Sequence, residues 1–123
     1  MRKIFDEGTI HDEEGAFEPY MTAQQFAYYL IRHGFKCAAN YIYKREPFLR
    51  KGGFVNFPCA SYTDVATPLM MAEKGVLTVT DAFFYFPVSP IQISTNFNVE
   101  VLKNKVLAIT QYAEWVRDYL NAF

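Results

Sequence analysis

The most regular pattern of apolar and polar positions in the chain lies in residues 98–123. Apolar side chains recur there at intervals of three and four, the spacing that places them on one face of an α-helix. They are Val99, Leu102, Val106, Ile109, Ala113, Val116, Leu120 and Phe123. Asn98 is suited to cap this helix, because its side-chain oxygen can accept a hydrogen bond from the first turn. The pattern predicts a long amphipathic C-terminal helix.

Two shorter helices are predicted nearer the N-terminus. Thr22 and Gln25 have the spacing of a capping box, so a helix is expected over residues 23–33. A further helix is expected over residues 63–74, with Pro68 in its first turn, where no backbone donor is missed.

Residues 76–86 are rich in β-branched and aromatic side chains, which favour a strand. Residues 91–95 alternate between apolar and polar types after a Ser-Pro turn, so an antiparallel hairpin is expected. Shorter strand patterns occur at residues 3–5, 35–43 and 54–57.

This order of elements describes an α+β domain. A small antiparallel sheet would be packed by the long C-terminal helix and by one or two shorter helices. Residues 1–20 contain glycines and a proline with little periodicity, so they are expected to form an extended acidic arm. Residues 21–123 are expected to form a single domain, since the 123-residue chain has the length of one core.

Composition narrows the class of protein. With 51% hydrophobic residues, the chain has enough apolar surface to fold. Two cysteines and a polar first segment favour a cytoplasmic protein without a signal peptide. The apolar run at residues 82–88 is much shorter than the roughly 20 residues that cross a membrane, so no membrane partner is expected.

Charge is unevenly distributed although the formal net charge is only −1, which argues against capture of nucleic acid by the whole chain. The acidic residues of the first segment are Asp6, Glu7, Asp12, Glu13, Glu14 and Glu18. Residues 32–51 carry six basic side chains and one acidic side chain. The acidic segment is therefore a predicted interface that would dock on the basic segment of a neighbouring molecule.

Residues 44–53 combine two basic pairs with a glycine pair. They contain Lys44, Arg45, Arg50, Lys51, Gly52 and Gly53. Cationic side chains and backbone amides could converge there on a phosphate, and neighbouring aromatic rings could stack on bases. The alternative is an exposed, charged hairpin tip, because the segment lacks the context of a phosphate-binding loop between a strand and a helix.

Metal and nucleophile chemistry are not favoured. His11, His33, Cys37 and Cys59 can be written as a zinc site, but the paired ligand spacing of zinc knuckles is absent. A Cys–His nucleophile pair has no supporting flanking sequence either. No catalytic residue, metal or cofactor is predicted, and the cysteines are interpreted as packing residues.

The aromatic run at residues 83–86 leaves two alternatives open. Phe83 and Tyr85 lie on one face of the predicted strand, and phenylalanines lie on the other. The strand is either central and covered on both sides, or at an edge with Phe83 and Tyr85 in an interface.

These features favour a non-enzymatic protein that works by protein–protein contact. The leading hypothesis is a self-associating structural or assembly component, of the kind found in phages and virions. The first alternative is a small inhibitor or adaptor that binds a larger host protein. The second is a nucleotide or nucleic-acid binding protein that uses residues 44–53.

Overall fold

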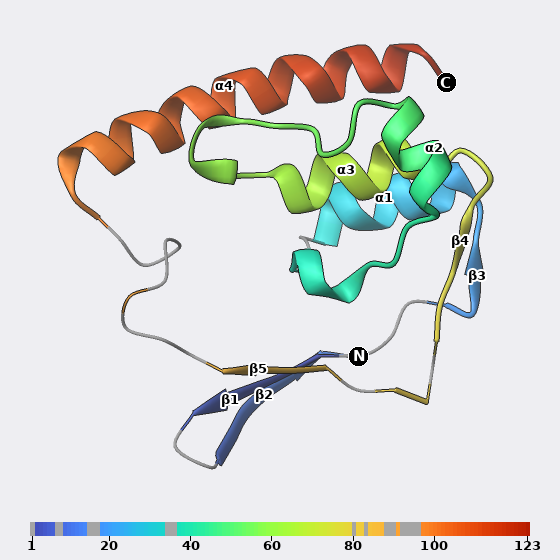
Figure 1. The fold of residues 1–123 in the computed structure, drawn as a ribbon, viewed down its shortest axis with the longest axis horizontal. Helices are drawn as coiled ribbons and strands as arrows, with labels where there is room; N and C mark the ends of the chain where they lie inside the picture. Colours follow the sequence, from blue (N-terminus) through green and yellow to red (C-terminus); the bar gives the residue numbers. More distant parts are fainter. Residues whose placement is uncertain are drawn as a thin grey trace.

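The fold is given by a computed structural model of the chain. It describes residues 2–6, 9–14, 18–33, 37–79, 81–82, 84–87, 91 and 97–123. The class is mixed α and β, as the sequence predicts. In Figure 1 the longest helix, α4, runs along one side of the molecule, and α1 and α3 lie beneath it. A three-stranded sheet lies on the opposite side of these two helices.

Four α-helices and two short 3₁₀ helices occur within the described residues. They are α1 (Ala23–His33), η1 (Ala38–Asn40), α2 (Arg45–Arg50), η2 (Pro58–Ala60), α3 (Thr63–Met71) and α4 (Val99–Asn121). The strands are β1 (Arg2–Asp6), β2 (Thr9–Glu14), β3 (Tyr20–Met21), β4 (Val76–Leu77) and β5 (Phe84–Pro87).

The predicted starts of α1 and α4 are confirmed by their caps. The Thr22 backbone N–H donates to Gln25 Oε1 at 2.9 Å, and the Gln25 N–H donates to Thr22 Oγ1 at 3.2 Å. At α4, the Val101 N–H donates to Asn98 Oδ1 at 2.9 Å. Each side chain satisfies a backbone donor that the first turn leaves unpaired, which fixes where the helix begins.

Helix α3 differs from its prediction in the place of its proline. Pro68 lies inside the helix, not in its first turn, and it is buried. A proline there removes one backbone hydrogen bond, so packing against the core has to offset that loss. The chain turns at Gly75, whose φ is +85°. A Cβ at Gly75 would lie 2.6 Å from the Met21 carbonyl oxygen, so the close approach of β3 requires glycine there.

The predicted strand over residues 76–86 is two strands in two sheets. Strand β4 pairs with β3 in antiparallel register, with Met21 opposite Val76. Strand β5 pairs with β1 in parallel, and β1 pairs with β2 in antiparallel register. The expected hairpin partner, residues 91–95, lies almost entirely outside the described residues. Each of these strands pairs with a strand far away in the sequence, so a local sequence pattern cannot predict the pairing.

The strand pattern at residues 3–5 is confirmed as part of β1, which pairs with β2 in a hairpin with a register shift between Ile4 and Phe5. The strands predicted at residues 35–43 and 54–57 are wrong, because residues 37–57 contain no strand. They form η1, α2 and extended connections in which the rings of Tyr41, Tyr43 and Phe48 stack on one another. The aromatic residues that favoured a strand are used for this stacking.

The core lies where α1, α3 and α4 meet the β3–β4 sheet. Phe26 and Leu30 of α1, with Leu69 of α3, are almost completely buried. Met21 of β3 belongs to the same cluster, and partly buried side chains of β4 and α4 pack against it. The small sheet and the long helix therefore share one core.

Candidate functional site

Helix α4 has two apolar faces, which lie about a third of a turn apart on an α-helix of 3.6 residues per turn. The inner face consists of Ala108, Tyr112, Trp115 and Tyr119. The outer stripe consists of Val99, Leu102, Val106, Ile109, Ala113, Val116, Leu120 and Phe123, the residues that define the pattern in the sequence.

The inner face packs on the domain. Ala108 is fully buried in a cluster with Phe57 and Ala66. The Tyr112 ring stacks on Tyr62, with centroids 4.5 Å apart and planes 8° apart. The small Ala108 side chain lets α4 approach the domain closely, and the Tyr112 ring supplies a large contact area.

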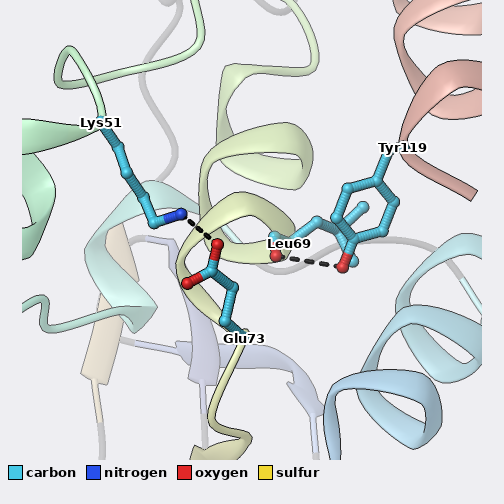
Figure 2. Close-up of polar contacts among 4 residues, drawn as sticks. All are labelled: Lys51, Leu69, Glu73 and Tyr119. Carbon is cyan, nitrogen blue, oxygen red and sulfur yellow. Dashed lines mark hydrogen bonds and ion pairs between the residues drawn. The ribbon is translucent and has the colours of Figure 1, made fainter. Parts of the chain in front are cut away.

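A side-chain hydrogen bond joins the C-terminal end of α4 to α3. The Tyr119 hydroxyl donates to the Leu69 carbonyl oxygen of α3 at 3.1 Å, as Figure 2 shows. The Tyr119 ring also stacks on Trp115, with centroids 5.1 Å apart. Burial, and then the Glu73 carboxylate, raise the pKa of Tyr119 above its ordinary value. Tyr119 is therefore neutral at physiological pH and can donate this bond.

The outer stripe is largely exposed, contrary to the expectation that it would cover the sheet. Val106 is 64% exposed and Ile109 is 50% exposed, whereas Ala108 between them is fully buried. Leu102 and Leu120 are also exposed, and Val116 is half-buried. An apolar row of this length on one helix is typical of a surface that meets a partner.

The flanks of the outer stripe are basic. Lys103 and Arg117 lie on one side of it, and Lys105 lies on the other. The Arg117 guanidinium contacts the neighbouring Asp118 carboxylate at 3.0 Å, and both side chains are mostly exposed. An exposed pair of this kind contributes little to stability.

The second candidate site is the basic segment, residues 44–53, which the structure forms as a helix and not as a hairpin tip. Arg45 begins α2 and Arg50 ends it. The backbone N–H groups of Gly52 and Gly53 donate to the carbonyl oxygens of Leu49 and Phe48 at 3.1 and 2.9 Å. Because these bonds close the end of α2, the two glycine amides are not directed at a ligand, which corrects that part of the sequence interpretation.

A pocket of about 800 Å³ opens beside α2. Its walls come from β3, the segment before α2, the end of α2, and the turn between α3 and β4. Of the six residues predicted to bind phosphate, Lys44, Arg50 and Lys51 line this pocket, whereas Arg45, Gly52 and Gly53 do not. Lys74 also lines it and was missed, because it lies outside the basic segment and reaches the pocket only through the fold.

One ion pair joins the two sides of this pocket. Lys51 Nζ, at the end of α2, contacts Glu73 Oε1 just after α3, and Figure 2 shows both side chains. The hydrogen bond and charge of Lys51 lower the pKa of Glu73. The Glu73 carboxylate is therefore ionised at neutral pH, where it pairs with Lys51.

The predicted acidic interface is only partly described. Asp6 lies in β1, and Asp12, Glu13 and Glu14 lie in β2. Glu18 is exposed. Tyr85 lies in β5, while Glu7 and Phe83 lie outside the described residues. In the described sheet, whose strand order is β2-β1-β5, β5 is an edge strand, which is the second of the two alternatives for residues 83–86, and the interface there stays a prediction.

Among the described residues, no group of three or more His, Cys, Asp or Glu side chains is arranged to hold a metal ion. His11 lies in β2 and His33 ends α1. The Cys37 thiol contacts the Asn40 amide oxygen at 3.2 Å within η1. Cys59 lies in η2 with a left-handed φ of 56°.

Comparison with models of protein families, with curated proteins and with solved structures finds no match for this chain. No described helix is both long enough and apolar enough to cross a membrane. The function has to be inferred from the outer stripe and the pocket themselves.

Proposed function

We propose that the chain is a non-enzymatic protein that self-associates through the outer stripe of α4. The single observation that supports this proposal is that α4 already packs on its domain by the inner face and still exposes a second apolar row. The row does not serve the monomer's core, and leaving it in water carries a free-energy cost that a partner would remove.

The spacing of the outer stripe suits a second copy of the same helix. Intervals of three and four over three and a half heptads form the seam of a two-stranded coiled coil. In the heptad notation, Val99 and Val106 take position a, and Leu102 and Ile109 take position d. Valine at a with leucine at d, as at Val99 and Leu102, favours two strands. Eight half-exposed side chains per copy would bury on the order of several hundred Å², approaching the area of a stable interface.

Charge favours a parallel pair. In an antiparallel pair, Lys103 would lie across from Arg117 of the second copy, and like charges there repel. In a parallel pair, Lys103 would face Asn98, Lys105 would face Thr110, and Arg117 would face Tyr112 of the second copy. No like-charge contact arises in that orientation.

The acidic residues 6–18 and the basic segment offer a second mode of association. Their opposite charges would join neighbouring molecules head to tail, and such contacts close into rings or continue as filaments. Salt separates the two modes. Contact between charges weakens as salt rises, whereas apolar burial does not.

A structural or assembly role, in the cytoplasm or in a virion, is the setting that we propose. Cys37 and Cys59 are both free thiols, which suits a reducing compartment. A helix that pairs with its own copy is one simple way to build a symmetric assembly from a short chain.

The test is sedimentation velocity across a concentration series, at low and at high salt. Wild-type protein is expected to form a dimer or larger species at both salt concentrations. Ile109→Glu places a charge in the centre of the outer stripe and is expected to give a monomer with unchanged helix content. Val79→Glu is the matched control, because Val79 is 62% exposed after β4, outside both the stripe and the basic segment, and this variant is expected to associate like wild type.

A wild-type chain that sediments as a monomer at every concentration would overturn self-association. The same stripe would then be assigned to a larger host protein, as an inhibitor or adaptor would use it. Association that is lost in high salt but kept in Ile109→Glu would favour the contact between the acidic residues and the basic segment.

A further inference from the structure

The pocket beside α2 has a strongly unequal charge distribution. Its charged lining residues are Lys44, Arg50, Lys51, Glu73 and Lys74. Lys51 and Glu73 are paired with each other. Within the described part of the chain, Lys44, Arg50 and Lys74 form no ion pair with a carboxylate, although the charge of Lys74 helps to lower the pKa of Glu73. Two cations from the basic segment and one from the turn after α3 therefore surround one cavity.

One wall of the pocket is aromatic. Tyr41 and Tyr43 line it with their rings stacked, at a centroid distance of 6.3 Å. The Tyr43 ring is supported in turn by Phe48 at 5.5 Å. Burial, and then the Asp64 carboxylate, raise the pKa of Tyr43, so its hydroxyl carries no negative charge. Because the Tyr43 ring is stacked between Tyr41 and Phe48, and the Tyr41 hydroxyl is buried, this wall offers a ligand a rigid aromatic surface and not a free ring face.

A second ring lies at the pocket rim. Tyr20 of β3 lines the pocket and is 54% exposed. Its ring is held against the turn at Gly75, because a Cβ on that glycine would come within 2.7 Å of the Tyr20 hydroxyl. The turn and β3 together fix the position of this ring.

We propose that this pocket binds a small phosphorylated ligand with a planar ring, of the nucleotide class. The guanidinium of Arg50 suits two phosphate oxygens at once, and Lys44 and Lys74 supply point charges. The exposed ring of Tyr20 at the rim supplies a face on which a base stacks, beside the aromatic wall. The cavity volume falls within the roughly 300–1,000 Å³ of small-molecule sites. The proposal is independent of self-association, since none of these residues lies on α4.

The pocket has no contribution from the Gly52 and Gly53 amides to phosphate binding. The amides of Gly52 and Gly53 are engaged in closing α2, and the pocket lies near the C-terminal ends of α2 and α3. A helix C-terminus carries partial negative charge, which disfavours an anion. Phosphate binding therefore depends on the basic side chains, and it is expected to be sensitive to their removal and to salt.

The experiment is isothermal titration of the full chain at low salt with ATP, GTP, CTP and UTP in turn, and with tripolyphosphate and adenosine. At least one nucleotide is expected to bind with a Kd below about 1 mM, a free energy of about −4 kcal/mol. It is expected to bind more tightly than tripolyphosphate, which lacks the ring, and than adenosine, which lacks the phosphates. The variant Arg50→Ala with Lys74→Ala is expected to weaken binding by tenfold or more.

The control variant is Arg32→Ala with Lys103→Ala, which removes the same charge from exposed positions outside the pocket. It is expected to bind the nucleotide within about twofold of wild type. Because both double variants lose two positive charges, the control measures how much binding weakens through net charge alone. Circular dichroism checks that both variants fold. The proposal is overturned if no nucleotide binds, if tripolyphosphate binds as tightly as the nucleotides, or if the two double variants weaken binding equally.

Discussion

The two apolar faces of α4 differ in composition and in use. The inner face is small and aromatic, and its rings meet specific partners on the domain, as Tyr112 meets Tyr62. The outer stripe is mainly aliphatic and more regular in spacing, yet Val106 and Ile109 remain exposed. Regular spacing therefore identifies the helix without identifying its buried side.

The physical reason lies in what each face can contact. A packed interior needs complementary shapes, and Ala108 lets α4 approach Phe57 and Ala66 closely. Partly buried tyrosines also need their hydroxyls satisfied, and Tyr119 finds the Leu69 carbonyl. A regular aliphatic row suits a partner with the same repeat, such as a second α4.

The largest expected difference between the faces is in folding stability. Trp115→Ala is expected to lower the free energy of unfolding by about 3 kcal/mol, the low end for aromatic truncations, since Trp115 is only partly buried. Ile109→Ala is the matched change on the outer stripe and is expected to alter it by less than about 0.5 kcal/mol. Urea unfolding of dilute protein, where association is weak, measures both.

Equal losses in these two variants would contradict the assignment of the faces. A large loss at Ile109 with a small loss at Trp115 would mean that the outer stripe is the buried one. The comparison uses dilute protein, because a dimer would make the stability of Ile109→Ala depend on concentration.

The bounds of α1 and the cap of α4 could be predicted, because capping side chains act within three residues of the backbone donors they satisfy. The buried face of α4 could not, since two apolar faces compete and only the domain surface decides between them. The sheet pairing also escaped prediction. Strands β4 and β5 are continuous in pattern but join β3 and β1, which lie at the other end of the chain.

The candidate sites, too, could be predicted only in part from the sequence. The basic cluster of residues 44–53 was visible in sequence, but its glycine amides close α2, and only some of its cations face the pocket. Lys74 joins them from a turn about 20 residues away, for which no local pattern exists. The residues of the outer stripe were all identified in sequence and assigned to the core.

A smaller effect is expected from enlarging an alanine on each face. Ala108→Leu is expected to lower the free energy of unfolding by about 1–3 kcal/mol, because Ala108 is fully buried against Phe57 and Ala66. Ala113→Leu lengthens an exposed position of the outer stripe and is expected to leave monomer stability unchanged. It is also expected to tighten self-association by about tenfold or more, since each buried CH₂ contributes about 0.8 kcal/mol.

Unfolding by urea and sedimentation velocity, applied to both alanine variants, separate the two effects. If Ala113→Leu destabilised the monomer and Ala108→Leu did not, the packing of α4 described here would be wrong. If Ala113→Leu left association unchanged, the outer stripe would not be the contact between copies.

The smallest expected effect isolates one hydrogen bond of the inner face. Tyr119→Phe removes the hydroxyl that donates to Leu69 and is expected to cost about 1 kcal/mol at neutral pH. The control is Tyr28→Phe, since Tyr28 is 63% exposed on α1, and little change is expected there.

The same tyrosine makes the inner face sensitive to alkali. Its pKa is raised in the folded state, so its contribution to stability is complete below the unfolded value of 10.0 and is lost as pH rises through the folded value. Wild type is therefore expected to lose stability above pH 10 more steeply than Tyr119→Phe, as measured by urea unfolding at each pH. Equal slopes would mean that Tyr119 ionises as readily in the folded chain as in the unfolded one.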